Sequence, residues 1–153
     1  MKEAARIADQ LQKSHEGNAW HGPALGELLD GVTAEQALAR PLADAHSICE
    51  IVLHLAGWTD LTTSVLEGDP TREPREGDWP SLAEAGAGAW EQAVEKLNRA
   101  QARLFAAASK LPDSRLQETA AGRDYTIGFM LLGVLQHNAY HAGQIALLKK
   151  VQA

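Results

Sequence analysis

The chain has 153 residues, of which 45% are hydrophobic and 22% charged, and its formal net charge is −6. This composition is typical of a folded protein and excludes a disordered one, and the length suits a single domain over residues 1–153. The acidic balance provides no basic field for phosphate, so we expect no nucleic-acid partner. No apolar run approaches the roughly 18 residues of a membrane span, so we also expect no membrane partner.

The cysteine content favours a reducing compartment. Cys49 is the only cysteine, so no intrachain disulfide can form. The N-terminal sequence MKEAARIADQLQKSHEG is charged and amphipathic and lacks the apolar centre of a signal peptide. We therefore expect a cytoplasmic protein. Cys49 itself is interpreted as a small core residue rather than a nucleophile.

The sequence pattern of the first third of the chain predicts one amphipathic helix followed by two short helices. Apolar residues recur at helical spacing over residues 3–15, and a glycine follows as a stop. Glycines and prolines then divide the chain and leave room for short helices at 23–30 and 33–39. Thr33 and Gln36 form a capping box at the start of the second short helix.

A second long helix is predicted over residues 47–67. Ser47 and Glu50 form a capping box at its start, and its apolar residues recur with a period that excludes a strand. Residues 68–80 follow as a loop with three prolines and six charges. Long loops of this kind often border a site in a compact domain.

Two more long helices are predicted in the second half of the chain. One covers residues 81–110, with Ser81 and Glu84 as a capping box, and the other covers residues 126–150, with Thr126 as its N-cap. No strand pattern and no internal repeat are found. The sequence therefore predicts an all-α fold, an antiparallel four-helix bundle with long connections.

Three of the six histidines lie inside the two most apolar predicted helices. His137 and His141 are four residues apart, so both imidazoles leave the last helix on one face, and His54 lies in the middle of the second long helix. Each alone is most simply a satisfied core histidine. Burying several imidazoles without partners is unfavourable, however, and one shared metal ion would satisfy all three.

A three-histidine site with an open position is suited to activating water on zinc or to ionising a bound thiol. Other metal sites have no sequence support, because the Glu-x-x-His of di-iron bundles, the HExxH of zincins and paired CxxC motifs are absent. Imidazole ligands suit zinc, nickel, copper and iron alike, so the residues alone leave the metal open.

Two residues are candidates to orient these imidazoles by hydrogen bonds. Glu50 lies one turn before His54, and Gln144 lies three residues after His141. The alternative for Glu50 is that it serves only in the capping box. No separate general base is apparent.

Five further residues are weaker candidates. Tyr140 and Asn138 either line a cavity or merely pack. His46 falls near the face of the second long helix that carries the candidate ligand but is interpreted as a loop or surface residue. His21 is a candidate fourth metal ligand, and His15 is interpreted as solvated.

The sequence IVLHLAGW around His54 and the C-terminal QHNAYHAGQIALLKK resemble the DinB/YfiT-like superfamily of metal-binding bundles. The likeness extends to WHGPALGELLDGVTAEQALARP near the start and to DWP before the third long helix. It implies an up-down-down-up four-helix bundle, often a homodimer, in which His54, His137 and His141 bind a divalent ion such as zinc or nickel. Characterised relatives include thiol S-transferases, which join low-molecular-weight bacterial thiols to electrophiles, and thiol-dependent isomerases.

We therefore expect a divalent-metal-dependent enzyme, a thiol S-transferase or a hydrolase, that acts on a small-molecule substrate such as a low-molecular-weight thiol. The alternative is a non-catalytic bundle that binds a metal or small ligand, or a homodimer whose metal is only structural. A fourth protein ligand, His21 or a carboxylate, would favour this alternative.

Overall fold

The computed structural model describes residues 2–83 and 86–153. These residues form α1 (Glu3–Glu16), α2 (Leu25–Leu29), α3 (Ala34–Leu38), α4 (Ile48–Leu66), α5 (Ala89–Ser109), the 3-10 helix η1 (Asp113–Gln117) and α6 (Ile127–Val151). Within them the only extended pairing is an isolated bridge between Thr119 and Thr126, so the all-α prediction is confirmed. None of the described helices is both long enough and apolar enough to cross a bilayer.

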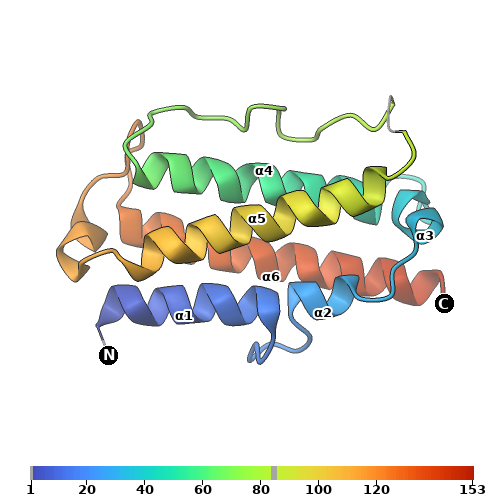
Figure 1. The fold of residues 1–153 in the computed structure, drawn as a ribbon, viewed down its shortest axis with the longest axis horizontal. Coiled ribbons are helices and arrows are strands. Elements are labelled where there is room, and N and C mark those ends of the chain that lie inside the picture. The colour runs from blue at the N-terminus through green and yellow to red at the C-terminus, as the bar shows by residue number, and fades with distance from the viewer. Residues whose placement is uncertain (1, 84–85) are drawn as a thin grey trace.

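The four long helices lie side by side with their axes roughly aligned. α1 and α6 run in one direction and α4 and α5 in the other, as the colours of Figure 1 show. α4 packs against both α5 and α6, and α1 packs against the same two helices from the other side. The two helices that carry the candidate ligands, α4 and α6, therefore pack directly against each other.

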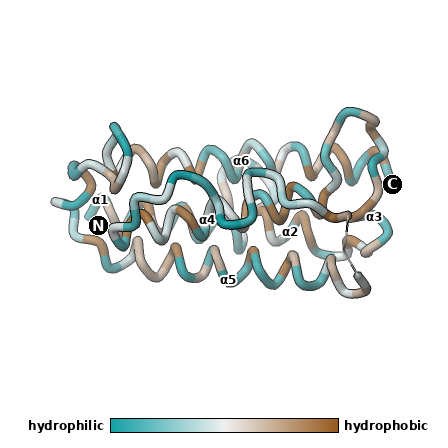
Figure 2. Tube along the Cα trace, turned by 90° about the horizontal axis from the view of Figure 1, so that it is seen from above, coloured by the Kyte–Doolittle hydropathy of each residue, from teal (hydrophilic) through white to brown (hydrophobic). Residues whose placement is uncertain are grey.

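A long crossover, described over residues 67–83 and 86–88, connects α4 to α5. Because these neighbouring helices are parallel, the chain must return along the whole length of the bundle between them. Figure 1 shows this segment passing above α4, and Figure 2 shows it from above, running along the bundle. The topology thus carries the loop predicted at 68–80 across the middle of α4.

The predicted caps are present at three helix starts. The amide N–H of Glu50 donates to Ser47 Oγ at 3.2 Å, and the Ser47 amide donates to the Glu50 carboxylate at 2.7 Å. Thr33 and Gln36 make the same reciprocal pair before α3. Thr126 Oγ1 accepts from the amide of Phe129 at 3.2 Å. Side-chain acceptors here satisfy N–H groups that have no partner inside the helix.

The predicted start of the third long helix is wrong. α5 begins at Ala89 rather than at residue 81, and Ser81 Oγ instead accepts from the amide of Ala83 at 3.1 Å. Glu84, the other half of the predicted capping box, lies outside the described residues. Gly88 takes a positive φ of 82°, a left-handed conformation that interrupts any helix passing through it. The helix therefore forms only after this glycine.

Two apolar clusters form the core at opposite ends of the bundle. The first apolar cluster includes Ile48, Cys49, Leu55, Leu97 and Ile145, and the second includes Leu11, Leu61, Leu104 and Leu131. Buried polar residues lie where these clusters meet along α4, α5 and α6. We call these residues, together with the half-buried His137, the polar layer; it comprises His54, Thr59, Gln101, His137, Asn138 and His141.

Candidate metal centre

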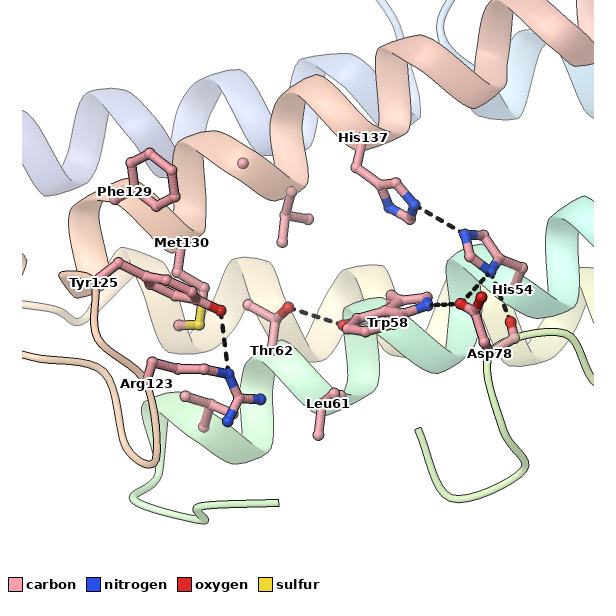
Figure 3. Close-up of a pocket in the computed structure, with 13 residues that line it drawn as sticks. His54, Trp58, Leu61, Thr62, Asp78, Arg123, Tyr125, Phe129, Met130 and His137 are labelled. Atoms are coloured by element: carbon pink, nitrogen blue, oxygen red, sulfur yellow. Dashed lines mark hydrogen bonds and ion pairs between the residues drawn. The ribbon is translucent and has the colours of Figure 1, made fainter. Parts of the chain in front are cut away.

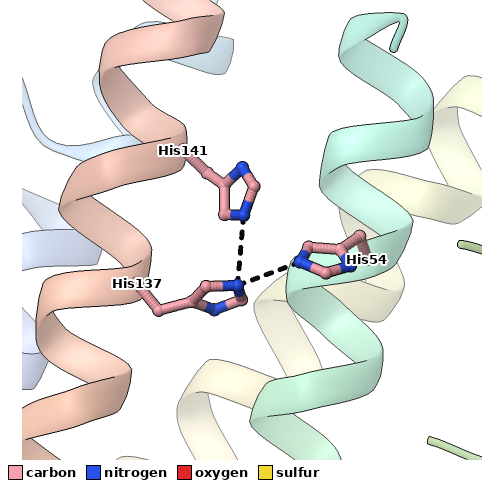
Figure 4. A group of neighbouring side chains, drawn as sticks. All are labelled: His54, His137 and His141. Atoms are coloured by element: carbon pink, nitrogen blue, oxygen red, sulfur yellow. Dashed lines mark hydrogen bonds between the residues drawn. The ribbon is translucent and has the colours of Figure 1, made fainter. Parts of the chain in front are cut away.

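Three imidazoles from α4 and α6 converge in the polar layer. His54 Nε2 lies 2.9 Å from His137 Nε2, and His141 Nε2 lies 3.1 Å from the same atom. The candidate ligand atoms of all three lie within 4.8 Å of one another. Figure 4 shows the three rings turned toward a common point between the two helices. The structure therefore brings together the three histidines that the sequence singled out.

Hydrogen bonds on the far side of two rings fix which nitrogen faces this point. His54 Nδ1 lies 2.7 Å from the backbone carbonyl oxygen of Asp78, and His141 Nδ1 lies 2.6 Å from Gln144 Oε1. A carbonyl oxygen only accepts, so each Nδ1 carries the hydrogen and each Nε2 presents its lone pair. The predicted role of Gln144 in orienting His141 is thus matched by the geometry.

The converging nitrogens fit a cation. The lone pairs of His54 and His141 both approach His137 Nε2, which can donate its single hydrogen to only one of them. A metal ion would accept all three lone pairs at once. Two nitrogens about 2.05 Å from a tetrahedral zinc are roughly 3.3 Å apart, close to the separations found here.

The surroundings of His137 and His141 favour the neutral form of these two rings. Burial lowers the pKa of His137 to about 4, and the neighbouring His141 and His54 rings act in the same direction. Burial also lowers the pKa of His141, although its hydrogen bond to Gln144 opposes the shift. At neutral pH both rings are therefore available as ligands rather than occupied by protons.

The crossover supplies partners that sequence reasoning did not assign. Asp78 Oδ1 accepts from the indole N–H of Trp58 at 2.7 Å and lies 3.3 Å from His54 Nδ1. The indole of Trp79 stacks on the His54 ring, with centroids 4.0 Å apart and planes 9° from parallel. Both residues belong to the DWP sequence, on which part of the family resemblance rests. That resemblance was the one signal in the sequence that pointed to them.

Glu50 does not take the orienting role considered for it. Its carboxylate caps Ser47 and pairs with Arg40, while the acceptor for the His54 ring is Asp78. Burial opposes ionisation of Glu50, but its hydrogen bonds to Ser47 and the nearby Arg40 charge lower its pKa overall. The capping alternative is therefore the one that the structure supports.

Cys49 is fully buried in the first apolar cluster, as predicted. Burial and the nearby Glu50 carboxylate raise the pKa of its thiol to about 11. A thiol of this kind stays protonated at neutral pH and is a poor nucleophile.

Of the weaker candidates, Tyr140 and His46 line a cavity, and Asn138 is packed in the interior. Tyr140 is exposed and lies edge-on to His141, with ring centroids 5.0 Å apart. Asn138 is buried, and neither polar atom of its amide has a hydrogen-bond partner among the described residues. His46 is half-buried and also stacks on Trp79, with ring centroids 3.6 Å apart.

The structure corrects the interpretations of two histidines. His21, the candidate fourth ligand, is exposed and lies outside the group formed by His54, His137 and His141. His15, expected to be solvated, is instead buried, and its Nε2 lies 3.0 Å from Asn98 Oδ1. Helix spacing carried a signal for this burial, because residue 15 lies about one turn after Leu11 on the buried face of α1.

Two cavities border the candidate metal centre. The apolar cavity, of about 400 Å³, extends between α4 and α6 on the His137 side and is drawn in Figure 3. The second cavity, of about 560 Å³, lies on the His141 side and is lined in part by Trp79 and Tyr140. His54 and Asp78 line both, so the two cavities meet at the histidine cluster.

Fold and site together define a helical-bundle protein with a candidate three-histidine metal centre. The chain belongs to the DinB superfamily, whose profile matches residues 19–145. That range contains all three histidines and the DWP sequence. Neither a curated protein nor a solved structure matches the chain.

Proposed function

We propose that the chain is a divalent-metal-dependent transferase that joins a low-molecular-weight thiol to an electrophilic small molecule. His54, His137 and His141 would hold the ion, and zinc and nickel, the ions that the family resemblance implies, are the first to test because imidazole ligands suit both. The observation that carries the proposal is the convergence of three Nε2 atoms at the meeting point of two cavities.

The donor set supports a catalytic rather than a structural ion. Within the described chain, the group contains three histidines and no fourth histidine, cysteine or carboxylate. Structural zinc sites are usually closed by four protein ligands, whereas catalytic sites keep one position for water or substrate. When bound, a divalent ion supplies Lewis acidity, which lowers the pKa of a coordinated thiol or water enough to give a nucleophile at neutral pH.

The two cavities favour transfer over hydrolysis. Each is large enough for a small molecule, and they share His54 and Asp78. A hydrolase needs one organic substrate and water, whereas a transferase needs room for a thiol and an electrophile, one on either side of the histidine cluster. We therefore assign one reactant to each cavity.

Asp78 is the proton acceptor in this proposal. Its Oδ1 is held by the Trp58 indole, and its carboxylate is exposed and borders both cavities. In the transfer step a sulfur–carbon bond forms and the bond from carbon to the leaving group breaks. The leaving group takes that electron pair, and the thiol proton passes to the Asp78 carboxylate.

Metal content is the first test. Purified protein loaded with zinc and then dialysed should retain one ion per chain, and a His137→Ala variant should retain almost none. His21→Ala is the matched control, since it removes an exposed histidine outside the cluster. Equal metal in wild type and His137→Ala would remove the basis of the proposal.

Activity separates the transferase from its rivals. The metal-loaded protein should couple cysteine to monochlorobimane with release of chloride, and His137→Ala should not. Hydrolysis of p-nitrophenyl acetate without coupling would favour the hydrolase. Metal binding without either reaction, across a panel of small thiols and electrophiles, would favour the non-catalytic binding protein.

A further inference from the structure

The apolar cavity has chemically different ends. His54 and His137 lie at one end, and Arg123 and Tyr125 lie at the other, as Figure 3 shows. The walls between them are apolar and include Leu61, Val65, Met130 and Val134. From Phe129 to His137 the cavity follows eight helical rises of α6, which is roughly 12 Å at about 1.5 Å per rise.

Arg123 is fixed at its end by neutral acceptors. Its Nε donates to Tyr125 Oη at 3.1 Å, and one terminal nitrogen donates to the carbonyl of Thr71 at 2.8 Å. The other terminal nitrogen makes longer contacts of 3.3 and 3.5 Å with the carbonyls of Ala121 and Pro70. Across residues 2–83 and 86–153, no carboxylate lies within ion-pair distance of this guanidinium.

The carboxylate whose pKa responds to Arg123, that of Asp69, is already engaged. Arg123 contributes to lowering the pKa of Asp69, after the hydrogen bonds that Asp69 accepts from Thr71. Those bonds, at 2.8 and 2.6 Å, turn the carboxylate toward its own loop. The positive charge of Arg123 is therefore only partly compensated within the protein.

Two hydrogen-bond donors remain at this end for a ligand. The Tyr125 oxygen accepts from Arg123, so its own hydrogen is left to donate elsewhere. A guanidinium has five N–H groups, and four are accounted for by the contacts above. The N-terminus of α6 follows directly after Tyr125 and adds partial positive charge.

In the metal-free protein, the opposite end disfavours an anion. Asp78 lines the cavity beside His54, and its carboxylate would repel a second one. A molecule that carries one negative charge and an apolar body would therefore lie with its charge at Arg123 and its other end at the histidines.

We propose that the apolar cavity binds the electrophilic substrate as an amphipathic monocarboxylate. Its carboxylate pairs with Arg123 and Tyr125, its apolar body lies along α4 and α6, and its reactive carbon reaches the histidines. This assignment of substrate class rests on the transferase proposed above. A carboxylate is favoured over a phosphate because one guanidinium and one hydroxyl match a planar monoanion, and a dianion would keep an unpaired charge.

The carboxylate subsite can be tested without metal. Calorimetric titration of metal-free protein should show octanoate binding at least about ten-fold more tightly than octanol, which has the same chain but no charge. Equal affinities would overturn the proposal. The ratio within one protein sample is the quantity to compare, because it is insensitive to a partly folded fraction.

Variants of Arg123 test whether this residue causes the preference for octanoate over octanol. Arg123→Met should bring the ratio of octanoate to octanol affinity close to one, and Arg123→Lys should keep part of it, because lysine retains the charge but not the hydrogen bonds that hold the guanidinium in place. An unchanged ratio in Arg123→Met would overturn the assignment. If that variant does not fold, Arg123→Lys decides the question through the same ratio.

A pair of glycine variants tests the cavity itself. Gly133 lines the apolar cavity, and a Cβ placed there would meet nothing within 4 Å. Gly133→Leu should therefore fill the cavity and abolish octanoate binding. Gly143→Leu is the matched control, since Gly143 lies on the same helix with equally open surroundings but is not among the residues lining this cavity. Loss in both or neither would place the ligand elsewhere.

A metal-loaded measurement separates this inference from the proposed function. 8-Mercaptooctanoate should exceed octanoate in affinity only when zinc is present, because its thiol reaches the histidine end. Selective octanoate binding without any zinc-dependent gain would leave the carboxylate subsite standing and count against the metal chemistry. A zinc-dependent gain with equal octanoate and octanol binding would do the reverse.

Discussion

The two apolar clusters and the polar layer between them differ in the interactions that their buried side chains make. Leu97 and Leu131 are fully buried among apolar neighbours, and their contribution follows from area removed from water. His54, Asn138 and His141 are as deeply buried, yet they present converging lone pairs and an amide without partners. Burying such groups is unfavourable unless something satisfies them.

This contrast shows where stability and function separate. The clusters would hold the four helices together with any well-packed set of apolar residues. The polar layer adds little to that and instead fixes three imidazoles with the help of Asp78 and Gln144. Substitutions in the two regions should therefore have opposite consequences for folding and for metal binding.

The largest effect is expected in the polar layer. His137→Ala should lower zinc affinity by at least about 100-fold, since loss of a ligand exceeds the 10–100-fold typical for its hydrogen-bond partners. The free energy of unfolding of the metal-free protein should change by less than about 1 kcal/mol. Competition titrations with a chelator and denaturant unfolding measure the two quantities. A large loss of stability with metal affinity intact would reverse the contrast.

The converse substitution lies in the first apolar cluster. Leu97→Ala should lower the free energy of unfolding by about 2–5 kcal/mol, because it leaves a cavity at a fully buried position on α5. Zinc affinity of the folded fraction should not change. Denaturant unfolding with a chelator titration at the same temperature checks this. A parallel fall in metal affinity would mean that the cluster and the site are not separable.

A smaller effect on zinc affinity is expected from the residue that hydrogen-bonds to a ligand. Gln144→Met removes the acceptor that fixes the His141 tautomer and should lower zinc affinity by about 10–100-fold. Gln136→Met is the matched control, as an exposed glutamine on the same helix. Equal zinc affinities of the two variants would show that the Gln144 hydrogen bond does not orient a ligand.

The pH dependence of stability should be the mildest effect. Because the pKa of His137 falls from an ordinary 6.5 to about 4 on folding, the unfolded chain takes up a proton in this window and the folded chain does not. The free energy of unfolding of metal-free protein should therefore decrease as pH falls from about 6.5 to about 4. His137→Gln should show a shallower decrease than wild type. Identical pH profiles would contradict the neutral, buried ring.

Local sequence rules predicted most of the helices. The capping boxes at Ser47 and Thr33 and the N-cap at Thr126 place three helix starts correctly, because each depends on residues only three positions apart. The pairing of His137 with His141 followed from helix periodicity in the same way. These features depend on neighbours along the chain, so the sequence alone determines them.

Features that depend on the return of the crossover could not be predicted. Asp78 meets His54 only because the parallel order of α4 and α5 sends residues 67–88 back across α4. The late start of α5 at Ala89 depends on the conformation of Gly88 at the end of that path. The contact between His15 and Asn98 likewise depends on how α1 meets α5. Contacts of this range have no local pattern to report them.

The central claim is that one divalent ion lies between the three Nε2 atoms. Anomalous diffraction from crystals of zinc-loaded protein, collected on both sides of the zinc absorption edge, tests it most directly. We expect a single strong peak within about 2.0–2.1 Å of Nε2 of His54, His137 and His141. No peak at that position, or a peak whose ligands are other residues, would contradict the account.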